Sequence, residues 1–137
     1  LQLIRSMGHG DKFVLSDVNF PSYSHANKLY RMDGLNIAQA AEALLSHFPL
    51  DSFIPHPVER MEIDGKPDEI NEVHQDLIDT VKKVSGDNWK VGSVERQKFY
   101  IEAKKAMAVI TTSDTRPYGC FMFTKGVLKP DGSVWVI

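Results

Sequence analysis

The chain has 137 residues, of which 42% are hydrophobic and 25% are charged, and its formal net charge is −2. This length is enough for one domain with a sizeable hydrophobic core, which we expect to span residues 1–137. The 16 lysines and arginines form no long run, and no apolar stretch reaches the ~18 to 20 residues of a membrane span, so we expect a small neutral ligand as partner, with no nucleic acid and no membrane.

The first predicted elements are a short helix and a buried strand. Residues 1–6 carry a fragment of an apolar helical face, and Gly8 follows at the position of a left-handed cap, so we expect native residues upstream of a truncated helix. The short apolar run within 12–17 is bounded by turn residues, which predicts a buried strand. Asp17 would then lie at the carboxyl end of this strand, where open α/β sheets bind their ligands.

The next stretch predicts a loop, a strand and an amphipathic helix. The aromatic, proline-broken segment 19–25 is expected to be a loop that walls a pocket, and 29–32 a short strand. Asn36 is a favourable N-cap with Gln39 at the capping-box position, and Pro49 is expected to stop the helix that follows.

The second half of the chain continues to alternate strands with helices. After a strand at 58–63, a helix is expected from about Pro67 to Ser85, with Ile70 on its apolar stripe. The remaining predicted elements are strands at 89–94, 108–111, 120–124 and 134–137, and a helix at 95–105. This order predicts an α/β fold, a single domain of three layers (α/β/α) with helices on both faces of a mixed, largely parallel sheet.

His9 stands out because it lies between two glycines just before the first strand. Glycine has no Cβ, so the backbone beside His9 can take positive φ values and let a ligand approach closely. We expect His9 and Asp17 to face one crevice as an acid/base pair. The residues alone are equally consistent with purely structural roles, in which His9 is a turn histidine at a helix end and Asp17 caps the following loop.

The remaining motifs predict neither a metal site nor a cofactor. The five histidines show no paired helical spacing and no cysteine support, and the glycines around His9 do not fit a dinucleotide or phosphate loop. His47 and His74, at the end of one helix and within another, are expected at the surface or its edge. Cys120 is the single cysteine; it allows no internal disulfide, indicates a reducing cytoplasm, and on its own suggests a small buried hydrophobe.

Several motifs, in matching order from Leu1 to about Leu128, resemble those of the L-fucose mutarotase family. They are Met7-Gly8-His9-Gly10-Asp11, Leu15-Ser16-Asp17, Asn19-Phe20-Pro21, Arg31-Met32-Asp33-Gly34-Leu35, Phe99-Tyr100 with Ala103-Lys104-Lys105-Ala106, and Tyr118-Gly119 before Lys125-Gly126. This family and the ribose pyranases form one superfamily of small proteins that convert sugar anomers.

The resemblance implies a role for each matching residue. His9 corresponds to the proton donor, Asp17 to a sugar-binding carboxylate and Arg96 to a further substrate contact. Tyr118, Gly119 and Cys120 correspond to a Tyr-Gly-Asn sugar-binding element, in which cysteine here replaces an amide that both donates and accepts hydrogen bonds. Either the backbone makes the essential contact at that position or the sugar preference has shifted. Without the resemblance, the sequence indicates only that Tyr118 is a packed aromatic residue and that Arg96 is a charged residue at the start of a helix.

The resemblance also implies an activity and an assembly. The expected activity is that of an isomerase that interconverts the α and β anomers of L-fucose, or of a related pyranose, without a cofactor. Two alternatives stay open: a D-ribose pyranase that interconverts pyranose and furanose forms, and a non-catalytic sugar-binding protein. Members of the family form ring-like homo-oligomers, often decamers, with sites near subunit boundaries, so a neighbouring chain is expected to complete the pocket.

Overall fold

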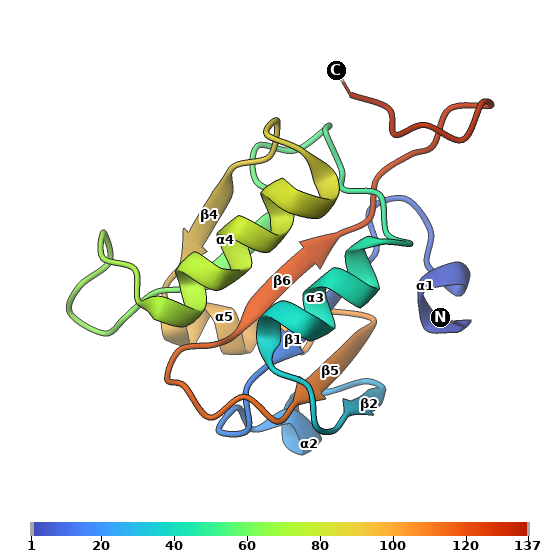
Figure 1. Ribbon diagram of the computed structural model, residues 1–137. Helices are drawn as coiled ribbons and strands as arrows, with labels where there is room; N and C mark the ends of the chain where they lie inside the picture. The colour runs from blue at the N-terminus through green and yellow to red at the C-terminus, as the bar shows by residue number, and fades with distance from the viewer. Residues whose placement is uncertain (1, 137) are drawn as a thin grey trace.

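The computed structural model describes residues 2–136, which form a six-stranded sheet with helices on both faces (Figure 1). In chain order the elements are α1 (Gln2–Ser6), β1 (Lys12–Ser16), α2 (Ser22–His25), β2 (Leu29–Met32), α3 (Ile37–Leu45), β3 (Val58–Met61), α4 (Glu72–Ser85), β4 (Val91–Val94), α5 (Arg96–Ala103), β5 (Ala108–Thr112) and β6 (Phe121–Thr124). The predicted three-layer α/β/α fold is confirmed.

The strand order in the sheet is β2-β5-β1-β6-β3-β4. β6 pairs antiparallel with β1 and β3, whereas the β1–β5, β2–β5 and β3–β4 pairs are parallel. The sheet is therefore mixed and largely parallel, as predicted. Because five strands point the same way, their carboxyl ends share one edge with the beginning of β6.

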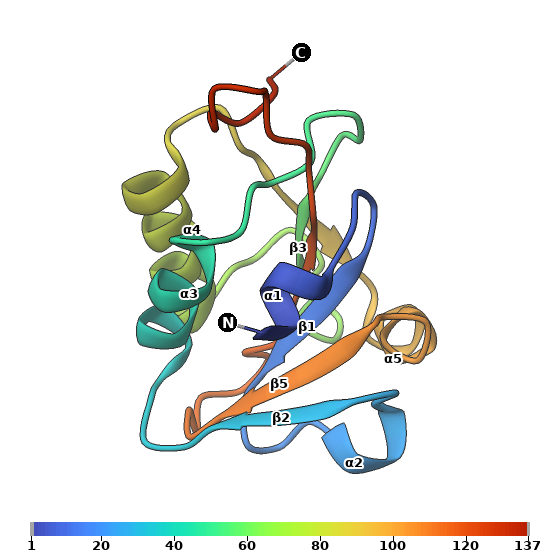
Figure 2. The same ribbon diagram turned by 90° about the vertical axis from the view of Figure 1, so that its right-hand side faces the viewer.

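The side chains of β1 point alternately to the two faces of the sheet, and the hydrophobic core accordingly has two layers. Phe13 and Leu15 face α1, α3 and α4, and the Phe13 ring stacks on Phe123 with centroids 4.8 Å apart. Val14 points to the opposite face and packs with Phe99 of α5. Figure 2 shows α3 and α4 on one side of the sheet and α2 and α5 on the other. Successive side chains of a strand point to opposite faces, so one short apolar run supplies both cores.

Helix α3 begins where the sequence predicts. The Asn36 side chain accepts the N–H of Gln39, and the Gln39 side chain accepts the N–H of Asn36, which completes the capping box. The helix ends at Leu45, with Ser46 as its C-cap, and therefore stops before Pro49.

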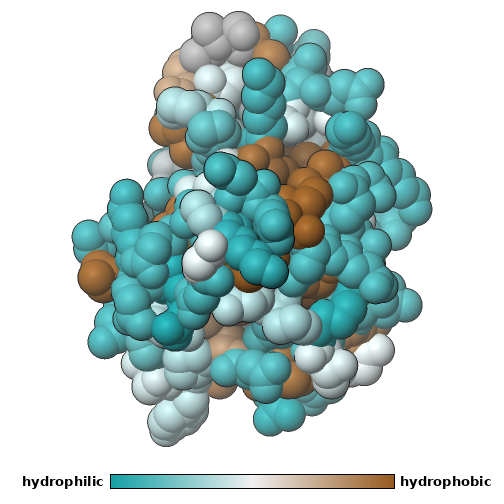
Figure 3. Space-filling view, turned by 90° about the vertical axis from the view of Figure 1, so that its left-hand side faces the viewer, coloured by the Kyte–Doolittle hydropathy of each residue, from teal (hydrophilic) through white to brown (hydrophobic). Residues whose placement is uncertain are grey.

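Helix α4 was predicted to start at about Pro67 but begins five residues later, at Glu72, because Asn71 forms its N-cap. The Asn71 side chain accepts a hydrogen bond from the N–H of His74, and the N–H of Asn71 donates one to Nδ1 of the His74 ring. Ile70 consequently lies outside the helix and is 44% exposed. The side of the molecule on which this loop projects is mainly hydrophilic, with hydrophobic atoms gathered near the middle (Figure 3).

Smaller differences from the sequence predictions occur in short segments. A four-residue helix, α2, forms within the predicted loop 19–25, and Gly10, rather than Gly8, has a left-handed φ of 85°. Residues 134–136 form no strand and make one isolated bridge, Leu128 to Val134, while residue 137 lies outside the described part of the chain. No helix within residues 2–136 is long and apolar enough to cross a membrane.

Candidate active site

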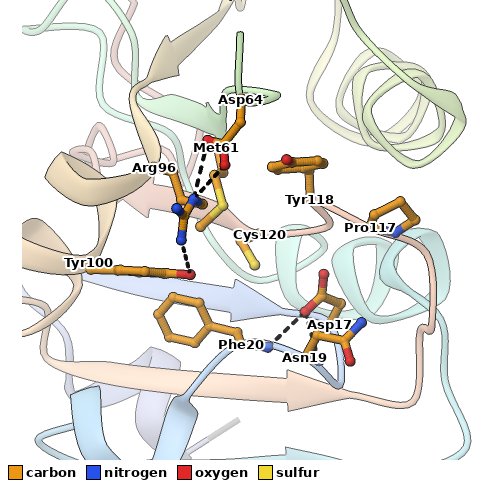
Figure 4. A pocket seen from close by; sticks show the side chains of 10 residues that line it. All are labelled: Asp17, Asn19, Phe20, Met61, Asp64, Arg96, Tyr100, Pro117, Tyr118 and Cys120. Atoms are coloured by element: carbon orange, nitrogen blue, oxygen red, sulfur yellow. Dashed lines mark hydrogen bonds and ion pairs between the residues drawn. The ribbon is translucent and has the colours of Figure 1, made fainter. Parts of the chain in front are cut away.

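A pocket opens at the sheet edge where β1, β3 and β4 end and β6 begins. Its volume is about 340 Å³, and small-molecule sites occupy roughly 300 to 1,000 Å³. Figure 4 shows Arg96 and Tyr100 on one side of the cavity, Asp17 and Tyr118 on the other, and Cys120 between them. The lining residues are Asp17, Asn19, Phe20, Met61, Asp64, Arg96, Tyr100, Pro117, Tyr118 and Cys120. Asp17, Arg96, Tyr118 and Cys120, all predicted from the sequence, thus line one cavity.

Asp17 is buried and holds two segments of the pocket together. Its Oδ1 accepts the N–H groups of Asn19 and Phe20, each at 3.0 Å, and its Oδ2 accepts the N–H of Gly119, also at 3.0 Å. The predicted site residue Gly119 therefore joins the site through its backbone. Burial raises the pKa of Asp17 above its usual value, while the three N–H donors act in the opposite direction.

Arg96 is the first residue of α5, which begins there because the Glu95 carboxylate caps the helix. Its Nε donates to Asp64 Oδ2 at 2.9 Å, and its Nη1 donates to the hydroxyl of Tyr100 at 3.3 Å. The guanidinium carbon lies 5.6 Å from the centre of the Tyr100 ring. With 34% of its side chain exposed, Arg96 is held in place and still accessible to a ligand.

Tyr118 has a left-handed backbone, with φ of 58°. Its carbonyl oxygen accepts a hydrogen bond from His74 Nε2 at 2.9 Å. The prediction that His74 lies at the surface or its edge is wrong, because His74 is 0% exposed. The difference arises because the later start of α4 places His74 in the first turn, directly under the loop that carries Tyr118.

Cys120 brings a buried thiol into the pocket beside Asp17. Burial and the negative charge of Asp17 raise the pKa of the thiol well above its usual value, so it stays protonated. The carbonyl oxygen of Cys120 accepts the N–H of Met61 at 3.0 Å and is occupied within the sheet. A ligand in the cavity therefore meets the side chain of Cys120 rather than its carbonyl.

His9 lies at the opposite end of β1 from Asp17. The backbone beside it pairs with the far end of β6, where the N–H of Gly10 donates to the Lys125 carbonyl at 2.9 Å. At about 3.3 Å per residue, the five steps from Lys12 to Asp17 span roughly 16 Å. The expectation that His9 and Asp17 face one crevice is therefore wrong within a single chain, because the strand that joins them is extended.

His9 has polar and aromatic neighbours of its own. Its Nε2 lies 3.2 Å from Oδ1 of Asp51, whose side chain is only 3% exposed, while the His9 side chain is 48% exposed. The His9 ring also lies 5.2 Å from the ring of Phe53, which in turn lies 6.2 Å from the ring of Trp135. The imidazole is thus held by Asp51 and Phe53, and about half of its side chain stays exposed to solvent.

Sequence reasoning missed part of the pocket. Tyr100 is four residues after Arg96 on α5, and this spacing places both side chains on the same face of a helix, so it was a usable signal. Met61 and Asp64 carry no comparable signal, because they reach the pocket only through the position of β3 in the sheet. Within residues 2–136, no group of three or more His, Cys, Asp or Glu side chains is arranged to hold a metal ion.

Comparison with known proteins gives consistent matches over most of the chain. Residues 1–128 match the RbsD / FucU transport protein family. The chain is 36% identical to an L-fucose mutarotase of Actinobacillus pleuropneumoniae, covering 93% of this chain and 88% of that protein. It is 40% identical to a fucose mutarotase of Bos taurus, covering 90% and 84%.

A solved structure agrees with these relatives. The fucose mutarotase of Streptococcus pneumoniae in complex with L-fucose superimposes with a TM-score of 0.86 at 34% identity, covering 93% of this chain and 91% of that one. The family match, the relatives and the fold all extend over the sheet and the pocket. The chain therefore belongs to the RbsD / FucU transport protein family.

Proposed function

We propose that the protein is a monosaccharide mutarotase that interconverts the α and β anomers of L-fucose or a related pyranose. The observation that carries this proposal is the cavity at the carboxyl edge of the sheet, where Asp17, Arg96 and Tyr118 converge. Relatives named fucose mutarotase, with 36% to 40% identity, support the same activity. The cavity combines charged and aromatic groups, which suits a sugar with hydroxyls and apolar C–H faces.

Each pocket residue is assigned a task that its geometry supports. A carboxylate offers about four lone-pair positions, and backbone N–H groups use three of those on Asp17. The Cys120 thiol is hydrogen-bonded to the same carboxylate, so a sugar hydroxyl competes at the fourth position with a weak donor only. Arg96 carries only donors and binds hydroxyl oxygens. Tyr118 orients the sugar ring. None of these tasks needs a metal or a redox cofactor.

The reaction requires the movement of two protons. A proton is added to the ring oxygen and another leaves the anomeric hydroxyl, so the bond from the anomeric carbon to the ring oxygen breaks and an aldehyde forms. The ring then closes on the opposite face and the protons return. Acid/base catalysis by positioned side chains contributes roughly 10²- to 10⁴-fold, and an imidazole exchanges protons near neutral pH. His9 is assigned the proton transfer at the ring oxygen.

His9 and the pocket are brought together by a homo-oligomer in this proposal. Because His9 and Asp17 lie at opposite ends of β1, the proton donor of each site is His9 of the partner subunit. The His9 side chain is 48% exposed while its Nε2 contacts Asp51, so the imidazole is oriented and still accessible to a partner subunit, which supports this arrangement. A closed ring, such as the decamers of the family, would repeat the same contact at every site.

The single cysteine, which is buried and unpaired, supports a location in the reducing cytoplasm.

Saturation-transfer proton NMR on L-fucose tests the proposal, with the wild-type protein and a His9→Ala variant. Exchange between fucose anomers that is accelerated by the wild type and not by the variant is the expected result. Faster exchange between the pyranose and furanose forms of D-ribose, without an effect on fucose, would select the ribose pyranase alternative. Sugar binding by a folded, assembled protein that accelerates neither exchange would leave a non-catalytic sugar-binding protein.

A further inference from the structure

The loop that carries Tyr118 is fastened to the beginning of helix α4. Asn71 Nδ2 donates to the carbonyl oxygen of Pro117 at 2.8 Å, and His74 Nε2 donates to the carbonyl oxygen of Tyr118 at 2.9 Å. The same two side chains form the capping box that starts α4. The helix cap and the attachment of the loop are therefore one unit, which we call the Asn71–His74 clamp.

The clamp holds an unusual backbone conformation. Among residues 2–136, Tyr118 is the one residue other than glycine with a positive φ, at 58°. Such conformations are uncommon for side chains with a Cβ and persist where the surroundings fix them. On the other side of Tyr118, the N–H of Gly119 is bound by Asp17 at 3.0 Å. Two successive peptide groups of the loop, one on each side of Tyr118, thus have partners that fix their direction.

His74 is suited to be a constant donor. Its side chain is 0% exposed and its ring meets Phe121 edge-on, with centroids 5.9 Å apart. The N–H of Asn71 donates to His74 Nδ1 at 3.3 Å, so the single proton of the neutral ring resides on Nε2, which faces the Tyr118 carbonyl. Burial lowers the pKa of His74 to about 4, and the ring stays neutral at physiological pH.

We propose that His74 is a positioning residue of the sugar site, which acts by holding the Tyr118 peptide so that the phenol ring faces the cavity, with Asn71 as its supporting partner. This inference rests on the proposed function, in which Tyr118 orients the sugar. A displacement of about 1 Å at a reacting centre can cost about 10²-fold in rate. His74 itself does not touch the sugar, because the Tyr118 peptide lies between them.

Three variants separate positioning from helix capping. His74→Phe keeps an aromatic ring against Phe121 but removes both the donor to Tyr118 and the acceptor of the Asn71 N–H. His74→Gln restores an amide N–H donor in place of Nε2. Asn71→Ser keeps a hydroxyl that caps α4 but lacks the amide that donates to Pro117. All three are compared with the wild type for thermal unfolding and for the kcat and KM of L-fucose anomer exchange.

We expect His74→Phe to raise KM for L-fucose about 10-fold or more, measured well below its unfolding temperature, and His74→Gln to recover most of the loss. Asn71→Ser should raise KM in the same direction by less, with little change in unfolding temperature. If His74→Phe lowers the unfolding temperature while KM and kcat stay at wild-type values, His74 only caps the helix and the proposal is wrong.

A second readout keeps this test separate from that of the proposed function. If the wild type accelerates neither fucose nor ribose exchange, the proposed activity fails, and the clamp is judged on the ring signals of ¹³C-labelled tyrosine. The Tyr118 signal is identified with Tyr118→Phe. A signal that moves in His74→Phe and returns in His74→Gln supports the clamp, whereas a signal that is unchanged in His74→Phe overturns it.

Discussion

The Nε2 atom of His9 lies 3.2 Å from Oδ1 of Asp51, so a nearly buried carboxylate holds a half-exposed imidazole. The same oxygen accepts the N–H of Phe53 at 3.1 Å, which fixes the carboxylate in turn. An imidazole oriented by a carboxylate is a recurrent arrangement for proton transfer, because the carboxylate sets both the tautomer and the direction of the ring. If His9 transfers protons, Asp51 determines how well it does so.

We expect Asp51→Asn to lower the rate of fucose anomer exchange about 10-fold or more, since acid/base catalysis contributes roughly 10²- to 10⁴-fold. The amide keeps an oxygen for the N–H of Phe53, so the fold should be retained. Asp33→Asn is the matched control, because it removes an exposed carboxylate that lies 3.2 Å from Arg31. Equal rates for the two variants, measured by saturation transfer, would show that His9 works without Asp51.

Mixed oligomers test whether each site takes residues from two chains. His9→Ala lacks the proposed proton donor and Arg96→Ala lacks a pocket residue, so neither should accelerate anomer exchange alone. When the two are unfolded, mixed in equal amounts and refolded together, about a quarter of the sites should pair an intact His9 with an intact Arg96. We expect a corresponding fraction of the wild-type rate. Mixed oligomers, verified by native mass spectrometry, that stay inactive would contradict a shared site.

The sequence predicts the scaffold of this protein better than its site. The apolar residues Phe13 and Leu15 alternate with Val14, and Asn36 with Gln39 completes a capping box, so local patterns were sufficient for β1 and for the start of α3. Periodicity also placed Asp17 at a strand end. It could not say which other strand ends would lie beside it, because that depends on the order of strands in the sheet.

The errors have the same origin. His9 and Asp17 are close in sequence, yet the predicted strand at 12–17 is extended, so its length alone already places them at opposite ends of it. The start of α4 was predicted too early because Pro67 is a good first-turn residue, whereas the reciprocal bonds of Asn71 and His74 fix the true start. His74 looked like a surface residue because its partner, the Tyr118 carbonyl, is 44 residues away in the chain.

The stability of the protein should fall in mild acid because of His74. Burial above all, together with the positive charge of Arg60, lowers the pKa of His74 from 6.5 to about 4. The unfolded chain therefore takes up the proton first, so the contribution of His74 is complete above pH 6.5 and is lost as the pH falls towards 4. The difference between the two pKa values corresponds to about 3 kcal/mol.

Chemical unfolding between pH 7 and pH 4 measures this effect, with His74→Gln as the comparison. We expect the wild type to lose more stability over this range than the variant, which has no titrating group at this position. Asp17 acts with the opposite sign in both proteins, because its raised pKa gives a contribution that is lost as the pH rises through that value. Identical pH profiles would mean that His74 can be protonated in the folded state.

Cys120 should determine which sugar the pocket prefers. Its carbonyl is occupied by the N–H of Met61 at 3.0 Å, so the position contributes its side chain to the cavity. The thiol lies against Asp17 and is a weak donor, whereas an asparagine amide would offer the sugar a strong donor and a strong acceptor. We therefore expect Cys120→Asn to change the ratio of fucose to ribose exchange rates by about 10-fold, the value of roughly one hydrogen bond. Cys120→Ala, which removes the thiol and adds no polar group, is the control for loss of the thiol. If Cys120→Asn folds, assembles and leaves the ratio at its wild-type value, the backbone rather than the side chain reads the sugar at this position.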